Sequence, residues 1–206
     1  MWQLVVKASL RLCAVLAVLL GLHHLYARQI IEFLLPLLRI ELLWLDDSFR
    51  ILYLGITNNP RGGTDTMIKL DVTLAKHVYV GTQLLAPNAG IKEMASTVTG
   101  TALRPLIVGI SMLWVCPAKN HWAYLQRTLI GIPLLLMILP FDVPLMLLGQ
   151  LYEILQFLAK TKEGFEYVIG WKVFLQGGGP IALALVAATV TISIVDHFSA
   201  HQEARK

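Results

Sequence analysis

The sequence predicts an α-helical integral membrane protein with about four transmembrane helices, a small extracytoplasmic β-hairpin segment and interfacial amphipathic helices. Hydrophobic residues make up 56% of the 206-residue chain and charged residues 15%, and the mean hydropathy is +0.66. A soluble surface needs more polar residues than this. Four apolar stretches recur along the chain, and between the first two the hydrophobic period changes from that of a helix to that of a strand.

The first predicted element is an N-terminal transmembrane anchor over residues 1–27. Lys7 and Arg11 stand before an uncharged apolar stretch, an outline that a secretory signal peptide shares. Leu25 stands where the cleavage rule for signal peptides wants a small residue. We therefore expect an uncleaved anchor, with a cleaved leader as the alternative.

Residues 28–98 are predicted to form an extracytoplasmic region that opens with an amphipathic helix over residues 28–49. Arg28 and Glu32 fall on one face of that helix, and Pro36 is expected to kink it. Such a helix is typical of one that lies in the membrane interface.

A β-hairpin is predicted next. Apolar and polar residues alternate over residues 68–74, which indicates a half-buried strand, and residues 50–57 are its expected partner across the turn formers of residues 58–63. The strand unit continues through residues 77–85. Because an isolated hairpin is marginally stable in water, we expect it to pack on the amphipathic helix or on a partner.

Residues 99–206 are predicted to form a three-helix membrane region. The spans are expected at residues 99–116, 122–139 and 179–197, and residues 140–178 are expected to form an interfacial loop.

Two prolines are expected to end the middle span of this region. Pro140 and Pro144 each remove a hydrogen-bond donor from a helix. Beyond them, residues 145–158 carry Gln150 and Glu153, which favours a helix lying in the interface.

Charge distribution predicts a multi-pass membrane protein with both termini in the cytoplasm, and we expect its membrane to be the bacterial inner membrane. Lys and Arg are denser in residues 1–11, 117–128 and 200–206 than in residues 28–98 and 140–178. The formal net charge of +4 is scattered and forms no basic cluster, so we expect no nucleic-acid binding. The expected partners are the lipid bilayer and another membrane or envelope protein.

Three adjacent glycines are the first candidate site. Gly177, Gly178 and Gly179 precede Pro180. A phosphate-binding loop needs a Lys and a Ser or Thr after the last glycine, and a dinucleotide-binding loop needs the spacing GxGxxG. The sequence has neither pattern here. A flexible turn before a membrane helix is the favoured interpretation, and a ligand or partner contact is the alternative.

Four histidines are candidate ligands. His23 and His24 are adjacent, so they diverge on a helix, and either a polar contact at the interface or a haem or metal ligand fits them. His197 and His201 are four residues apart and share a helix face, which suits two metal ligands, but no third ligand is evident. A solvated C-terminal helix is the favoured alternative, and we expect no cofactor.

Arg104 and Asp142 are candidate partner contacts at the membrane edge. Arg104 is expected to reach the lipid headgroups or to grip an acidic group such as Asp142 or Glu153. Asp142 lies between two prolines, where it is expected to reach water and cap the next helix.

The order of one N-terminal span, an external segment with strand character and three closely spaced hydrophobic stretches resembles small accessory membrane proteins of exosortase-type sorting systems. The resemblance implies an accessory role. No GxSxG turn or Cys and His catalytic pair is evident. We therefore expect a non-enzymatic accessory or scaffold subunit, and a cofactor-binding redox or enzyme subunit that holds haem or a metal is the alternative.

Overall fold

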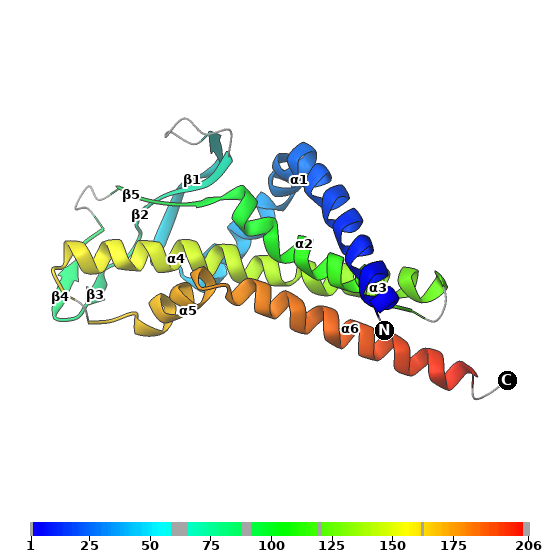
Figure 1. The fold of residues 1–206 in the computed structure, drawn as a ribbon. Helices are drawn as coiled ribbons and strands as arrows, with labels where there is room; N and C mark the ends of the chain where they lie inside the picture. Colours follow the sequence, from blue (N-terminus) through cyan, green and yellow to red (C-terminus); the bar gives the residue numbers. More distant parts are fainter. Residues whose placement is uncertain (1, 59–65, 88–91, 119–120, 162, 204–206) are drawn as a thin grey trace. The chain divides into compact units, whose positions relative to one another are not determined.

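The computed structural model describes residues 2–58, 66–87, 92–118, 121–161 and 163–203 (Figure 1). The chain divides into two compact units. The first unit comprises Met1–Tyr26, Leu103–Leu139 and Gly179–Lys206, and the second comprises Ala27–Ala102 and Pro140–Gly178.

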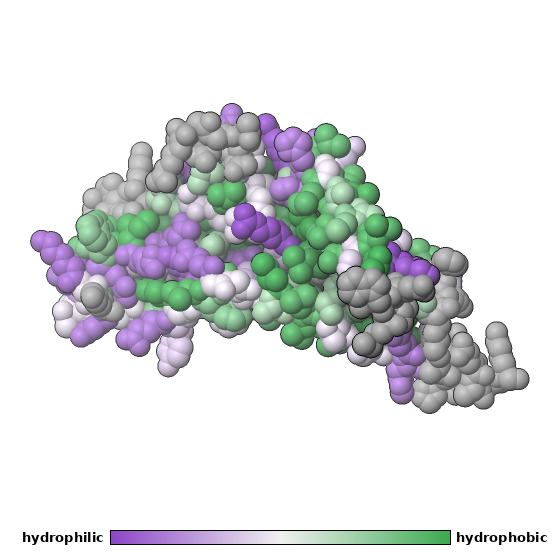
Figure 2. Space-filling view, in the orientation of Figure 1, coloured by the Kyte–Doolittle hydropathy of each residue, from purple (hydrophilic) through white to green (hydrophobic). Residues whose placement is uncertain are grey.

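Three helical stretches of the described chain are long and apolar enough to cross a membrane. They are Ser9–Leu45 and Trp122–Leu158, each of 37 residues, and Gly179–Phe198, of 20 residues. The remaining predicted span forms α2, Thr99–Val115, a shorter apolar helix of 17 residues. Hydrophobic side chains gather over the helices of the first unit on the visible face (Figure 2). The coarse prediction of an apolar helical protein with a small sheet is confirmed.

Helix α1 runs without interruption from Trp2 to Leu45, through Pro36. The predicted anchor and the predicted amphipathic helix are therefore parts of one helix. In its second half, Ile31, Leu38 and Leu42 are buried at a spacing that forms a single seam. The hydrophobic periodicity indicated that the chain becomes amphipathic after residue 27. It did not indicate that the backbone stays helical across that point.

The predicted hairpin is confirmed. Strand β1, Phe49–Asn58, pairs antiparallel with β2, Thr66–Leu74, in a register that places Ile56 opposite Ile68. The buried side chains of β2 alternate strictly, at Ile68, Leu70, Val72 and Leu74. A second, short hairpin follows, made of β3, Val78–Val80, and β4, Gln83–Leu85.

A third strand completes the larger sheet. Strand β5, Lys92–Val98, pairs antiparallel with β2 on the side away from β1, so the strand order is β1-β2-β5. Sequence periodicity did not reveal β5, because its residues are mostly small or polar. Its presence gives the central strand two neighbours, and a three-stranded sheet is more stable than a hairpin.

The expected helix stop at the prolines is wrong. Helix α3, His121–Leu136, is interrupted only at Met137, and α4, Ile138–Leu158, then continues through Pro140 and Pro144. Pro140 is the third residue of α4, where a backbone N–H has no partner within the helix and its absence costs little. The helix is therefore interrupted for one residue, at Met137, and resumes at Ile138, two residues before the proline.

The predicted interfacial loop at residues 140–178 is thus mostly helical. It contains most of α4 and also α5, Glu166–Gln176. Helix α6, Gly179–Glu203, follows and begins where the last span was predicted to begin.

The core of the first unit lies between α2, α3 and α6. Leu113, Leu135, Ala184 and Ala188 are fully buried there. A Cβ atom on Gly131 of α3 would lie 2.5 Å from a methyl carbon of Leu113, so the small residue permits the close approach of these helices.

The core of the second unit lies between the larger sheet and α4. Leu147, Leu151 and Leu155 form the buried seam of α4. The backbone N–H of Ser96 in β5 donates to Oε1 of Gln150 at 3.0 Å. Gln150, expected to face the interface, is thus a sheet contact.

Candidate functional site

A buried arginine organises one end of the first unit. Arg127 of α3 is 1% exposed, and its Nη2 donates to Oδ1 and Oδ2 of Asp196 in α6 at 2.7 and 2.9 Å. Its Nη1 donates to the carbonyl oxygen of Cys116 at 2.8 Å. The guanidinium therefore joins α3 to α6 and satisfies a carbonyl that the end of α2 leaves open.

Aromatic residues surround this arginine. The guanidinium lies 5.8 Å from the ring centre of Tyr124, and that ring stacks on Trp114 at 5.9 Å. The Tyr124 hydroxyl accepts hydrogen bonds from Nη1 of Arg11 and from the backbone N–H of Ala118, both at 3.1 Å. We define the Arg127 cluster as Arg11, Trp114, Tyr124, Arg127 and Asp196.

The Arg127 cluster is equipped to hold helices together. Arg127 is held by a carboxylate and by backbone carbonyls. The cluster joins residues from the N-terminal helix, from the segment around residue 117 and from the C-terminal helix at one end of the unit.

A second cluster organises the other unit around Tyr152 of α4. Its hydroxyl donates to Oδ2 of Asp46, which follows α1, and its ring stacks on Phe165 at 3.9 Å with an interplanar angle of 14°. Phe49, the first residue of β1, packs against the same ring at 5.7 Å. Oδ1 of Asp46 accepts the backbone N–H of Ser48 at 2.8 Å, which shapes the turn from α1 into β1.

A buried lysine joins α5 to α4. Lys172 is 6% exposed, and its Nζ donates to Oε2 of Glu153. Glu153, expected to face the membrane interface, is thus half of an ion pair that fixes α5. No local sequence pattern marks Lys172, Tyr152, Arg127 or Asp196, because the partners of these residues lie far away in the chain.

The two predicted partner contacts differ in exposure. Arg104 is exposed on α2. Asp142 lies inside α4 and is 6% exposed, instead of reaching water at a helix break. The difference follows from the continuity of α4 through the two prolines.

The three glycines form the junction between α5 and α6. Gly177 caps α5, with its N–H donating to the carbonyl oxygen of Val173 at 2.9 Å. Gly178 has φ of +101°, a conformation that disfavours every residue with a Cβ, and Gly179 is the first residue of α6. This local geometry accounts for glycine in a turn between two helices.

The candidate histidine ligands lie on α1 and α6. His23 is partly buried and its Nε2 atom has no hydrogen-bond partner, whereas His24 is exposed. The ring of His197 lies 6.4 Å from that of Phe198, and the side chain of His201 is outside the described residues. Within the described part of the chain, no three His, Cys, Asp or Glu side chains are grouped to hold a metal ion.

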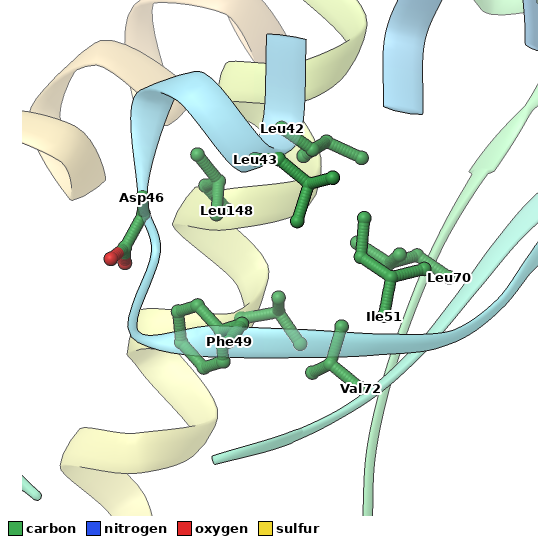
Figure 3. A pocket seen from close by; sticks show the side chains of 9 residues that line it. Leu42, Leu43, Asp46, Phe49, Ile51, Leu70, Val72 and Leu148 are labelled. Atoms are coloured by element: carbon green, nitrogen blue, oxygen red, sulfur yellow. The ribbon is translucent and has the colours of Figure 1, made fainter. Parts of the chain in front are cut away.

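One small pocket lies in the second unit (Figure 3). Leucines from α1 and α4 line it together with Phe49, Ile51 and Val72 from the sheet, and Asp46 stands at its edge. Its volume of about 10 Å³ holds roughly one water molecule. The pocket is therefore a packing defect of the core and too small for an organic ligand.

No protein-family model, no curated protein and no solved structure matches the chain. The resemblance of its layout to accessory proteins of exosortase-type systems stays a prediction.

Proposed function

We propose that the protein is a non-enzymatic accessory or scaffold subunit of the bacterial inner membrane that docks on another envelope protein through the sheet of its second unit. The helices of the first unit anchor it in the lipid bilayer. The two clusters support a structural role, because their charged groups are engaged in joining helices and strands.

The open edge of β1 is the observation that carries the docking proposal. Among the described residues, β1 pairs with β2 only, through nine of its ten residues. Edge strands of monomeric proteins are usually protected by shortness, charge, proline or a β-bulge. Strand β1 is ten residues long and has neither lysine nor proline, and its one charge, Arg50, and its one irregularity, between Ile51 and Tyr53, both lie near its start. An extended segment of a partner can add to such an edge through backbone hydrogen bonds.

The side chains of β1 suit this mode of docking. Leu52 is 50% exposed and Tyr53 44% exposed, beside the irregularity that breaks the register between Ile51 and Tyr53. Large apolar side chains next to an open edge provide the contact area that makes strand addition specific.

The Arg127 cluster supports the expected sidedness. Charge density places the N-terminus, the segment around residue 117 and the C-terminus on the cytoplasmic side. The hydrogen bonds of Arg11 and Arg127 join residues in or next to the first two segments to Asp196, near the end of the last predicted span. On this topology residues 28–98 and 140–178 are expected on the other side of the membrane, where envelope proteins reside.

Purification from membranes in mild detergent, followed by mass spectrometry, tests the proposal. We expect a stoichiometric envelope protein to accompany the wild-type chain. Tyr53→Glu is expected to lower its recovery about tenfold, because a charge at the docking edge must be desolvated. Tyr79→Glu is the matched control, since Tyr79 is 71% exposed on the other hairpin, and should retain the companion. A strictly monomeric wild-type protein would contradict the proposal.

A further inference from the structure

Helix α5 directs its aromatic side chains outward. Tyr167 is 94% exposed, and Trp171 and Phe174 are both more than 40% exposed. Their spacing of four and three residues places them in one stripe along the helix. The rings of Trp171 and Phe174 lie 5.1 Å apart. We call these three residues the aromatic stripe.

The buried side of α5 carries a charged residue. Lys172, the only basic residue of the helix, is buried and paired with Glu153 of α4. A Cβ atom on Gly149 of α4 would lie 2.6 Å from the Cβ of Lys172, so α5 packs closely at this point. The ion pair and the close contact fix the rotation of α5 and hold the aromatic stripe away from α4.

A helix on a water-facing surface normally exposes its lysines and buries its aromatic residues. Helix α5 does the reverse. Tyrosine and tryptophan concentrate where a bilayer meets water, because each has an apolar ring and a polar group. The chemistry of the aromatic stripe thus fits a lipid interface, with the rings among the upper acyl chains.

Chain connectivity also directs α5 to that level. Only Gly177 and Gly178 separate α5 from Gly179, where a helix of membrane-spanning length begins. Three chain steps extend at most about 11 Å. If α6 crosses the bilayer, the end of α5 lies within that distance of the start of the span.

We propose that α5 lies in the membrane interface, with Tyr167, Trp171 and Phe174 inserted at the boundary between lipid headgroups and acyl chains. The inference rests on the membrane location given under the proposed function. Helical geometry places Glu166 and Val173 roughly 100–130° around the helix from the aromatic stripe. Both are exposed, so they lie on the face that remains toward water.

Spin-label accessibility in the full-length protein tests this placement. Single-cysteine variants Tyr167→Cys, Trp171→Cys and Phe174→Cys are made in a Cys13→Ser, Cys116→Ser background. Each is labelled with a nitroxide and reconstituted in vesicles of phosphatidylcholine and phosphatidylglycerol. Oxygen, which enters lipid, and a water-soluble nickel chelate then compete as relaxation agents. Glu166→Cys and Val173→Cys are the matched controls, and Val186→Cys on α6 marks the bilayer interior.

We expect the three stripe labels to show an oxygen-to-nickel collision ratio roughly threefold or more above that of the two controls, because their side chains leave water. Equally low ratios at all five positions of α5 would place the aromatic stripe in water and overturn the inference. Equally high ratios would place all of α5 in lipid, which also contradicts a helix with one face toward water. Low collision rates with both agents at the stripe would show that protein covers it, which also overturns the inference.

The label at Val186 separates this inference from the membrane location on which it rests. A lipid-embedded label there, together with water-exposed stripe labels, refutes the placement of α5 alone. A water-exposed label at Val186 refutes the membrane location as well.

Discussion

Arg127 carries a full positive charge and is nevertheless 1% exposed. Burying a guanidinium is unfavourable unless its donors are hydrogen-bonded and its charge is compensated. Asp196 provides the charge, and the carbonyl of Cys116 provides a further acceptor. The Nε atom of Arg127 is buried without a partner, so the compensation depends on the two Nη atoms.

Removing the negative charge of Asp196 tests whether it stabilises the buried Arg127. Asp196→Asn keeps the shape of the side chain and leaves Arg127 buried with carbonyl partners only. We expect a loss of about 1–3 kcal/mol of stability, at the lower end because the side chain of Asp196 is 52% exposed. The measurement is the Tm of the purified protein in detergent.

Glu32→Gln is the matched control for Asp196→Asn. The Arg28 and Glu32 pair has a similar separation of 2.8 Å, but both side chains are about half exposed or more. Exposed pairs of this kind contribute little, so Tm should not change measurably. If the two substitutions lower Tm equally, the burial of Arg127 adds nothing to the stability that its ion pair contributes.

These residue contacts were not predictable from the sequence. Arg127 and Asp196 are 69 residues apart, and Asp46 and Tyr152 are 106 apart. Neither pair has a local pattern, because the chain brings its members together only through helix packing. Arg127 was recognised only as a charge that flanks a span.

At the scale of elements, periodicity predicted well where one face of an element is buried. The alternation in β2 and the apolar run of α6 both appear in the structure. Local signals misled at Pro140 and Pro144, because a proline early in a helix costs little and α4 accommodates the second inside it. Strand β5 was missed because its stability comes from pairing with β2.

The packing of α5 on α4 gives a prediction at this scale. Gly149→Ala would place a Cβ 2.6 Å from the Cβ of Lys172, an atom next to the backbone that cannot rotate away. The two helices must separate, and we expect a loss of about 1–3 kcal/mol, measured as a lower Tm in detergent.

Gly170→Ala is the control within the same helix pair. Gly170 lies inside α5, and a Cβ there would meet no atom within 4 Å. Alanine favours the helix, so stability should rise by about 0.5–1 kcal/mol. If both substitutions stabilise the protein, α5 does not pack on α4 at Gly149.

At the scale of the whole molecule, composition was informative about class and silent about partners. The hydrophobic content predicted apolar helices, and three of membrane-spanning length are present in the described residues. The division of the chain into two units interleaves distant segments: the second unit, Ala27–Ala102 and Pro140–Gly178, takes in the two regions predicted to lie between the spans, residues 28–98 and 140–178. A single sequence identifies a binding partner only where it contains a recognisable binding motif.

Docking through β1, the placement of α5 and the expected sidedness all depend on lipid surrounding the apolar helices. Sedimentation of membranes after a wash in alkaline carbonate tests this most directly, since the wash removes proteins held by charge or by partner contacts. We expect the protein to stay in the membrane pellet and to be released by detergent alone. A helical, monodisperse protein in the carbonate supernatant would contradict the account.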